Sequence, residues 1–170
     1  MIKRPSLATL KKMVMPIKPS SKTYIQIGFL QKAYPSVLAE MAYAVGFTSA
    51  LIIRGNEGGV LPTLHEPANF FQAKSGEASS CVLNPANFGL SQTARGVLPI
   101  QIEEVTPAET VDIGLQALSG QFGPAFDSLV YGAAIGLWHC GLQNSQQGAA
   151  DHVRQFYQSG RAKAFFERTL

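Results

Sequence analysis

The chain has 170 residues, of which 46% are hydrophobic and 15% are charged, so it is long enough for one globular domain with its own core. No stretch approaches the ~20 consecutive apolar residues of a membrane-spanning helix, so we expect no membrane partner. The two cysteines, Cys81 and Cys140, match neither a disulfide framework nor a zinc-binding pattern, which favours a cytoplasmic protein.

The net charge of +3 hides an asymmetry between the two parts of the chain. No acidic residue precedes Glu40, and from Glu40 onward seven basic and eleven acidic residues give a net charge of −4. The basic residues before Glu40 are Lys3, Arg4, Lys11, Lys12, Lys18, Lys22 and Lys32. This basic head either meets a polyanion such as nucleic acid, through Lys3, Arg4, Lys11, Lys12, Lys18 and Lys22, or forms an ordinary solvated helix face.

The first half of the chain predicts a strand–helix–strand unit. Residues 4–15 have helical spacing of apolar residues, and Pro16 ends that helix. "TYIQIGF" alternates like a strand, the helix from Pro35 ends at Gly46, and "TSALIIRG" is an apolar run typical of a strand that is buried on both faces. The short joints indicate a right-handed βαβ unit with parallel strands.

The middle of the chain is less regular. "ANFFQAK" and "SSCVLN" predict short strands joined as a hairpin across "SGEA", and "NPANFGL" predicts a turn with one anchoring aromatic ring. "VLPIQIEEV" contains Pro99, which favours an edge strand or an extended connection.

The last 65 residues predict helices. Thr106 to Glu109 match a capping box for a helix that runs to Gly120. Pro124 opens the next helix, with one face expected to be buried, and two shorter helices follow. The residues expected on that buried face are Phe126, Leu129, Val130, Ala133, Ala134 and Leu137. We therefore predict a single α/β domain over residues 1–170, with a small, mostly parallel sheet flanked by helices.

The turn "RGNEGG" lies at the carboxyl end of the second predicted strand, where ligands of parallel sheets bind. Its glycines Gly55, Gly58 and Gly59 permit positive φ or close approach of a ligand. Arg54 with Asn56 suits a phosphate group, and Glu57 suits a hydrated Mg²⁺ ion. The turn matches neither the P-loop nor the GxGxxG motif, so from spacing alone a plain tight turn is an equal interpretation.

Four segments resemble the C-terminal part of the anthranilate phosphoribosyltransferase family, glycosyltransferase family 3. They are "ALIIRGNEGG", "NPANFGL", "ETVDIGLQALSGQFGPAFDSLVYGAAIGLWHCG" and "SGRAKAFFERTL". The resemblance implies the C-terminal half of a phosphoribosyltransferase-type domain, a phosphoribosyl pyrophosphate ligand and Mg²⁺. It also implies that Arg4 matches an arginine that contacts the aromatic acid. The Arg-Gly after the strand is similar to a divergent branch that has been associated with nucleic-acid binding.

The departures from the family pattern concern the catalytic parts. The family's N-terminal helical domain and its Gly-Thr-Gly-Gly-Asp loop are absent from this sequence, and Val60 and Leu61 stand where the family has its Mg²⁺-binding acid pair. We therefore expect a C-terminal portion that is not catalytic alone and that needs a missing N-terminal part, self-association or a partner chain. The alternatives are a non-enzymatic protein that binds nucleic acid or another polyanion, and a truncated paralogue that acts as a protein-interaction subunit.

Overall fold

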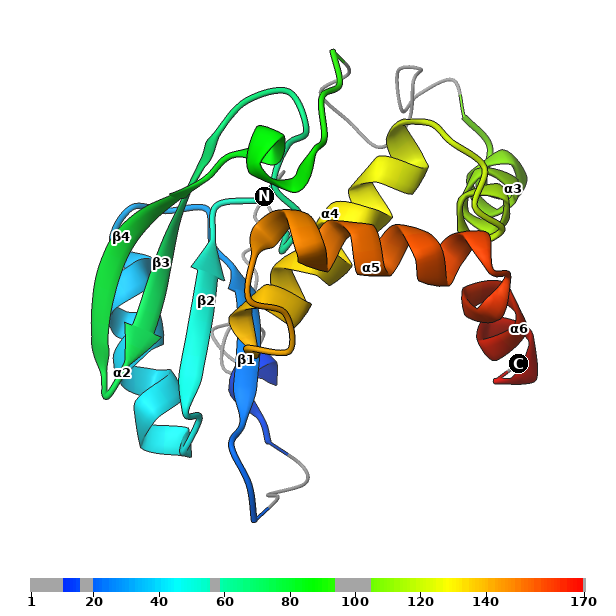
Figure 1. The fold of residues 1–170 in the computed structure, drawn as a ribbon. Coiled ribbons are helices and arrows are strands. Elements are labelled where there is room, and N and C mark those ends of the chain that lie inside the picture. Colours follow the sequence, from blue (N-terminus) through cyan, green and yellow to red (C-terminus); the bar gives the residue numbers. More distant parts are fainter. Residues whose placement is uncertain (1–10, 16–19, 56–58, 94–104, 170) are drawn as a thin grey trace. The chain divides into compact units, whose positions relative to one another are not determined.

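The computed structural model describes residues 11–15, 20–55, 59–93 and 105–169 of the chain (Figure 1). The chain divides into two compact units. The first comprises Met1–Val60 and Asn69–Val82, and the second comprises Leu61–Ala68 and Leu83–Leu170. The first unit holds the sheet and one helix, whereas the second is mainly helical.

The first unit begins with the predicted βαβ arrangement. Strand β1 (Tyr24–Gly28) pairs in parallel with β2 (Ser49–Ile53), in register from Tyr24 opposite Ser49 to Gly28 opposite Ile53. Helix α2 (Tyr34–Val45) makes the crossover, has a proline in its first turn, and packs on one face of the sheet (Figure 1). It ends at Gly46, whose φ of 105° is favourable only for glycine. The βαβ prediction is therefore confirmed.

Strand β2 is the buried centre of this unit. All five of its residues are buried, with Leu51, Ile52 and Ile53 at 0% exposure. On the α2 side, Ile52 packs in a cluster that includes Leu38 and Ala42 of the helix. Burial of each large aliphatic side chain contributes about 1.5–3 kcal/mol, so β2 accounts for a large share of the stability of the unit.

The sheet is completed by a hairpin. Strands β3 (Ala68–Lys74) and β4 (Glu77–Leu83) are joined by Ser75 and Gly76, with φ angles of 53° and 83°. Positive φ at both central residues is what a type I′ turn requires. The strand order is β1-β2-β3-β4, and β3 runs antiparallel to β2. The expectation of a mostly parallel sheet is thus wrong: the sheet is mixed, because β3 runs antiparallel to β2 and the two-residue turn reverses the chain between β3 and β4.

The second unit packs a short 3-10 turn, η3 (Pro85–Phe88), against two of four helices. The helices are α3 (Pro107–Leu118), α4 (Pro124–His139), α5 (Gln146–Gln158) and α6 (Arg161–Arg168). Phe88 is fully buried and meets Tyr131 of α4 edge to face at 4.9 Å. Arg154 of α5 donates to the carbonyl oxygens of Phe88 and Gly89 at 2.9 and 2.8 Å. The predicted capping box of α3 is present, with Thr106 and Glu109 bonded reciprocally.

The buried face of α4 is rotated from the predicted one. Phe126, Val130 and Ala134 are buried as expected, but Ala133 is exposed and Leu129 and Leu137 are only half-buried. Tyr131 and Ile135 are buried instead. Because α4 is apolar around most of its circumference, the sequence pattern does not define which side faces the core.

The predicted first helix is only partly covered by the described residues. Of residues 4–15, Lys11–Met13 form a single 3-10 turn, η1, in place of an α-helix, and Met13 packs into the core of the first unit. Residues 4–10 and most of "VLPIQIEEV" lie outside the described residues. Within the described ranges, none of the helices has the length and apolarity needed to cross a bilayer.

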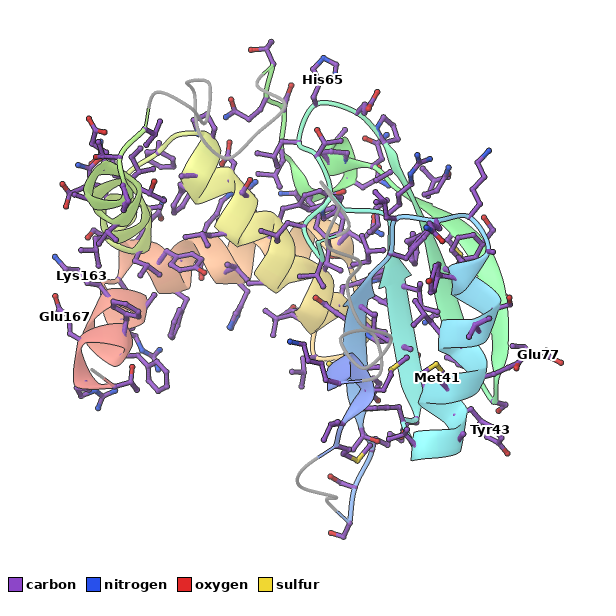
Figure 2. All side chains as sticks on the ribbon, turned by 180° about the vertical axis from the view of Figure 1, so that it is seen from behind. Met41, Tyr43, His65, Glu77, Lys163 and Glu167 are labelled. Carbon is purple, nitrogen blue, oxygen red and sulfur yellow. The ribbon has the colours of Figure 1, made fainter. Side chains whose placement is uncertain are left out.

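Side chains of both units are drawn in Figure 2. Met41 and Tyr43 project from α2 of the first unit, and Lys163 and Glu167 lie one turn apart on α6 of the second. The Lys163 and Glu167 charges are 3.9 Å apart and well exposed, so this ion pair contributes little to stability.

The hydroxyl of Tyr131 gives a stability prediction. It is buried and has no hydrogen-bond partner among the described residues, and burial raises the pKa of Tyr131. An unsatisfied buried polar group costs about 1–3 kcal/mol. We expect Tyr131→Phe to leave the free energy of unfolding unchanged or to raise it by about 1 kcal/mol, measured by urea denaturation. Tyr43→Phe, at a 60% exposed position, is the control and should change it by less than about 0.5 kcal/mol.

Candidate anion-binding site

The carboxyl ends of β1 and β2 form the edge of the first unit that carries the candidate site. Directly after β1, the backbone N–H of Phe29 donates to the carbonyl of Ile53 at 3.0 Å. Directly after β2, the N–H of Arg54 donates to the carbonyl of Asn69 on β3 at 3.2 Å. These two bonds extend the sheet by one residue at each strand end, so the backbone that carries Phe29 and Arg54 is held in place.

A pocket of about 270 Å³ opens at this edge. Its lining residues come from four places in the unit: Phe29 and Lys32 after β1, Arg54 after β2, Asn69 and Phe71 on β3, and Ser80 on β4. All of them belong to the first unit, so the pocket is formed within that unit alone.

The sheet geometry explains why the three hairpin residues converge. Asn69 and Phe71 are two positions apart on β3 and therefore face the same side. The two-residue turn pairs Lys74 with Glu77, which places Ser80 opposite Phe71. Phe71 is also opposite Ile52 of β2, whose side chain lies on the α2 side of the sheet. The pocket therefore lies on the α2 side of the sheet, next to the core cluster of the first unit.

The pocket combines positive charge with an aromatic wall. Lys32 and Arg54 are exposed, and neither side chain makes an ion pair or hydrogen bond with another described residue. None of the described lining residues is acidic. Asn69 and Ser80 add an amide and a hydroxyl that can donate to oxygen atoms. The Phe29 and Phe71 rings meet edge to face at 5.7 Å. Such a set of groups is suited to an anion of the phosphate type.

Few of the residues predicted from the "RGNEGG" turn can be placed. Arg54 lines the pocket, Gly55 is buried and Gly59 is exposed. Arg4, Asn56, Glu57 and Gly58 lie outside the described residues. Their assignment to a phosphate or metal site stays a prediction.

Five lining residues were not predicted as site residues from the sequence: Phe29, Lys32, Asn69, Phe71 and Ser80. Lys32 could have been found, because it lies in the joint that follows β1, and ligands bind at such joints. Asn69, Phe71 and Ser80 carry no such signal, since their convergence depends on the pairing of β3 with β2 and β4.

The two positions predicted to match the family's metal-binding acid pair carry no ligand for Mg²⁺. Val60 and Leu61 offer no side-chain oxygen, which Mg²⁺ requires. Leu61 instead packs on the bare backbone of Gly132 in α4, so closely that a methyl group at position 132 would collide with it. Across the part of the chain that is described, no three His, Cys, Asp or Glu side chains gather to hold a metal ion.

The basic head is described only in part. Lys11 and Lys22 are exposed. The structure does not describe the side chain of Lys12, and Lys3, Arg4 and Lys18 lie outside the described residues. The described lysines are therefore accessible to a polyanion.

The model of the family described as "Glycosyl transferase family, a/b domain" matches residues 4–163. The chain is 24% identical over 166 residues to the anthranilate phosphoribosyltransferase of Methanobrevibacter smithii, covering 97% of this chain and 48% of that protein. It is 26% identical over 137 residues to the Nitrosomonas eutropha enzyme, covering 81% of this chain and 39% of that protein. The chain thus spans less than half the length of these relatives.

Solved structures share the fold. Anthranilate phosphoribosyltransferase from Saccharomyces cerevisiae superposes with a TM-score of 0.67 at 18% identity, over 85% of this chain and 41% of that chain. The Thermus thermophilus enzyme superposes with a TM-score of 0.60 at 20% identity, over 83% of this chain and 40% of that chain. One structure of the yeast enzyme contains phosphoribosyl pyrophosphate and Mg.

The contact between Leu61 and Gly132 gives a second prediction. A helical Gly→Ala change usually stabilises by about 1 kcal/mol, as we expect for the control Gly114→Ala in α3, where nothing lies within 4 Å of the added methyl group. We expect Gly132→Ala to lack this gain because it displaces Leu61. When Leu61→Ala is also present, Gly132→Ala should again stabilise the protein. A double-mutant cycle, with free energies of unfolding from thermal or urea denaturation, should then give a coupling of about 0.5–3 kcal/mol between the two substitutions. Additive effects would contradict the packing of Leu61 on Gly132.

Proposed function

The chain belongs to the glycosyl transferase family with an a/b domain, and we propose that it acts as a phosphate-binding portion of an anthranilate phosphoribosyltransferase-like protein. The observation that carries the proposal is the pocket at the carboxyl ends of β1 and β2, where Arg54 and Lys32 face a common space with Asn69 and Ser80. Arginine binds phosphate through paired N–H groups, and lysine adds a mobile point charge. The phosphoribosyl pyrophosphate bound by the yeast relative is the first ligand to test.

The proposed binding does not require a metal ion. If Val60 and Leu61 match the family's metal-binding acids, that place has no oxygen ligands, and the cations of the pocket would neutralise phosphate charge directly. Transfer chemistry depends on stabilising the charge of the departing pyrophosphate, and loss of one electrostatic donor commonly costs about 10²–10³ in rate. We therefore propose that the chain is not a competent transferase alone. A further segment, a second copy or a partner chain would have to supply the remaining catalytic groups.

Calorimetry with phosphoribosyl pyrophosphate tests the proposal. We expect binding in EDTA at least as tight as in Mg²⁺, because the metal would compete with the protein's cations for the phosphates. Arg54→Gln should weaken binding roughly 10- to 100-fold, since a charge-assisted hydrogen bond contributes about 1.5–3 kcal/mol. Lys74→Gln removes the same charge from the opposite end of β3 and should leave the affinity within about twofold.

Two results would contradict the proposal. Absence of binding by the chain, and by any longer product of the same gene, would exclude a phosphate ligand of this kind. Equal losses for Arg54→Gln and Lys74→Gln would mean that general surface charge, not the pocket, attracts the ligand.

A second candidate is a non-enzymatic protein that binds nucleic acid or another polyanion. It is supported by the exposure of Lys11 and Lys22 in a segment without acidic residues before Glu40. Here the bound groups are backbone phosphates, which are contacted by separate lysines and not by a pocket.

Salt dependence separates the second candidate from the first. We expect the logarithm of the affinity for single-stranded DNA to fall linearly with the logarithm of salt concentration, with a slope set by the number of phosphates contacted. The double change Lys11→Gln and Lys12→Gln should lower affinity and slope without sequence preference, as fluorescence anisotropy would show. Lys163→Gln on α6 is the matched control. Affinity that is absent or insensitive to salt would exclude polyanion binding.

A further inference from the structure

We infer that the pocket at the carboxyl ends of β1 and β2 binds a terminal phosphate group with two negative charges and discriminates against a phosphodiester, which has one. This inference rests on the proposed phosphate-binding function and adds the class of phosphate that the pocket takes. Phosphoribosyl pyrophosphate agrees with it, because the monoester and the pyrophosphate of that compound each end in a terminal phosphate group.

The charge of the pocket matches a doubly charged phosphate. Lys32 and Arg54 supply two positive charges from two places, the joint after β1 and the residue after β2. Within the described residues, neither side chain forms an ion pair, and no acidic side chain lines the pocket. A phosphate monoester carries a charge of about −1.5 to −2 at pH 7. A phosphodiester carries a single negative charge and would leave one of the two cations without a counter-charge.

The backbone fixes the places from which the two cations extend. The N–H of Arg54 donates to the carbonyl of Asn69 at 3.2 Å, so Arg54 is tied to β3. Lys32 lies in a turn in which the N–H of Tyr34 donates to the carbonyl of Gln31 at 3.1 Å. A site whose backbone is already ordered loses less conformational entropy when the ligand binds. Both charges are thus available to one ligand without a rearrangement of the strands.

An apolar wall closes the pocket toward the core cluster. Phe29 is 6% exposed and belongs to that cluster, and Phe71 packs against it and meets Phe29 edge to face at 5.7 Å. A terminal phosphate has one substituent, which can point away from this wall into solvent. A phosphodiester has two substituents, and the second would have to lie against the rings or leave through the same opening. The shape of the pocket therefore disfavours a diester for a reason that is independent of charge.

Two neutral side chains complete the set of donors. The amide of Asn69 and the hydroxyl of Ser80 line the same pocket as the two cations. A terminal phosphate offers three strong acceptor oxygens, one more than the phosphate of a diester. Four donor side chains suit the larger number of acceptors better.

The volume separates this site from the basic head. A pocket of about 270 Å³ is below the usual range for drug-sized ligands, about 300–1,000 Å³. It has room for a phosphate group and the atoms next to it, and not for a length of polymer. The phosphodiesters of a nucleic acid would therefore be ligands of the basic head and not of the pocket.

Ethyl phosphate and diethyl phosphate test the inference on the full chain, because they differ only in the second ester group. Their affinities are measured by NMR titration of the ¹⁵N-labelled protein, with the amide signals of Arg54, Phe71 and Ser80 reporting the site. At pH 7.5 we expect ethyl phosphate to bind roughly 10- to 100-fold more tightly, the factor that one further charge-assisted hydrogen bond contributes.

The pH dependence shows whether the second charge of the ligand is recognised. The second pKa of a phosphate monoester is about 6, so its second charge is mostly lost at pH 5, and the affinity for ethyl phosphate should fall roughly 10-fold between pH 7.5 and pH 5. Sulfate keeps two charges over this range, and its affinity should stay nearly constant. The described lining contains no histidine, the side chain whose ordinary pKa lies in this range, and its ionisable side chains are Lys32 and Arg54. The expected fall therefore originates in the ligand.

Three variants assign the second charge to the pocket. Lys32→Gln removes one of the two cations and should abolish most of the preference for ethyl phosphate over diethyl phosphate. Lys32→Arg keeps the charge and should retain the preference. Lys22→Gln removes the same charge from an exposed residue at the amino end of β1, away from the pocket, and should change neither affinity.

The outcomes distinguish the inference from the proposed function. Equal affinities for ethyl and diethyl phosphate, both weakened by Arg54→Gln, would overturn the inference and leave the phosphate pocket standing. A preference that survives in Lys32→Gln, or a loss of sulfate affinity at pH 5 equal to that of ethyl phosphate, would also overturn it. Failure of every phosphate probe and of phosphoribosyl pyrophosphate to bind would overturn both.

Discussion

The candidate site depends on the burial of one short strand, β2. Its five residues are all buried, so a shift by one position would exchange the side chains that pack on its two faces. Its parallel register with β1 puts Gly28 opposite Ile53, and the residues that follow these two are Phe29 and Arg54. An apolar constraint in the core therefore determines where a charged side chain and an aromatic ring meet at the edge of the sheet.

The hairpin extends this constraint to the other side of the pocket. Phe71 is opposite Ile52, and the hairpin turn at Ser75 and Gly76 places Ser80 opposite Phe71. A longer connection at that turn would alter which β4 residue faces the pocket. The polar groups of the site are thus positioned by backbone pairing, and no hydrogen bond between the described lining side chains is needed to hold them.

The sequence predicted those parts of the structure that depend on local patterns. The βαβ unit, the end of α2 at Gly46, the hairpin and the capping box at Thr106 each follow from a spacing or a residue type within a few positions. Arg54, which lines the pocket, was proposed as a site residue in the same way, because it follows an apolar strand. The buried side of α4 was predicted less well, since Tyr131 and Ile135 face the core for reasons that lie in other elements.

The remaining lining residues were unpredictable for a similar reason. Asn69, Phe71 and Ser80 are ordinary strand residues, and only the pairing of three strands brings them beside Arg54. The expectation of a mostly parallel sheet drew attention to the ends of parallel strands alone. In a mixed sheet, an antiparallel neighbour adds residues from its first positions to the same edge, and here those positions are Asn69 and Phe71.

Leu61 belongs to the second unit and stands at a position predicted to match a metal-binding acid of the family. A carboxylate in its place would need oxygen-binding partners, whereas the leucine side chain packs on Gly132, a position without a side chain of its own. Restoring an acid at position 61 would therefore put a charge against an apolar helix surface, in addition to supplying one ligand for a metal ion. Under the proposal that position 61 matches a metal-binding acid of the family, one substitution would not restore metal binding, because this apolar contact would also have to be replaced. Under the proposal, binding of a phosphate by fixed cations and its activation by a metal are separate properties, and the described residues retain the means for only the first.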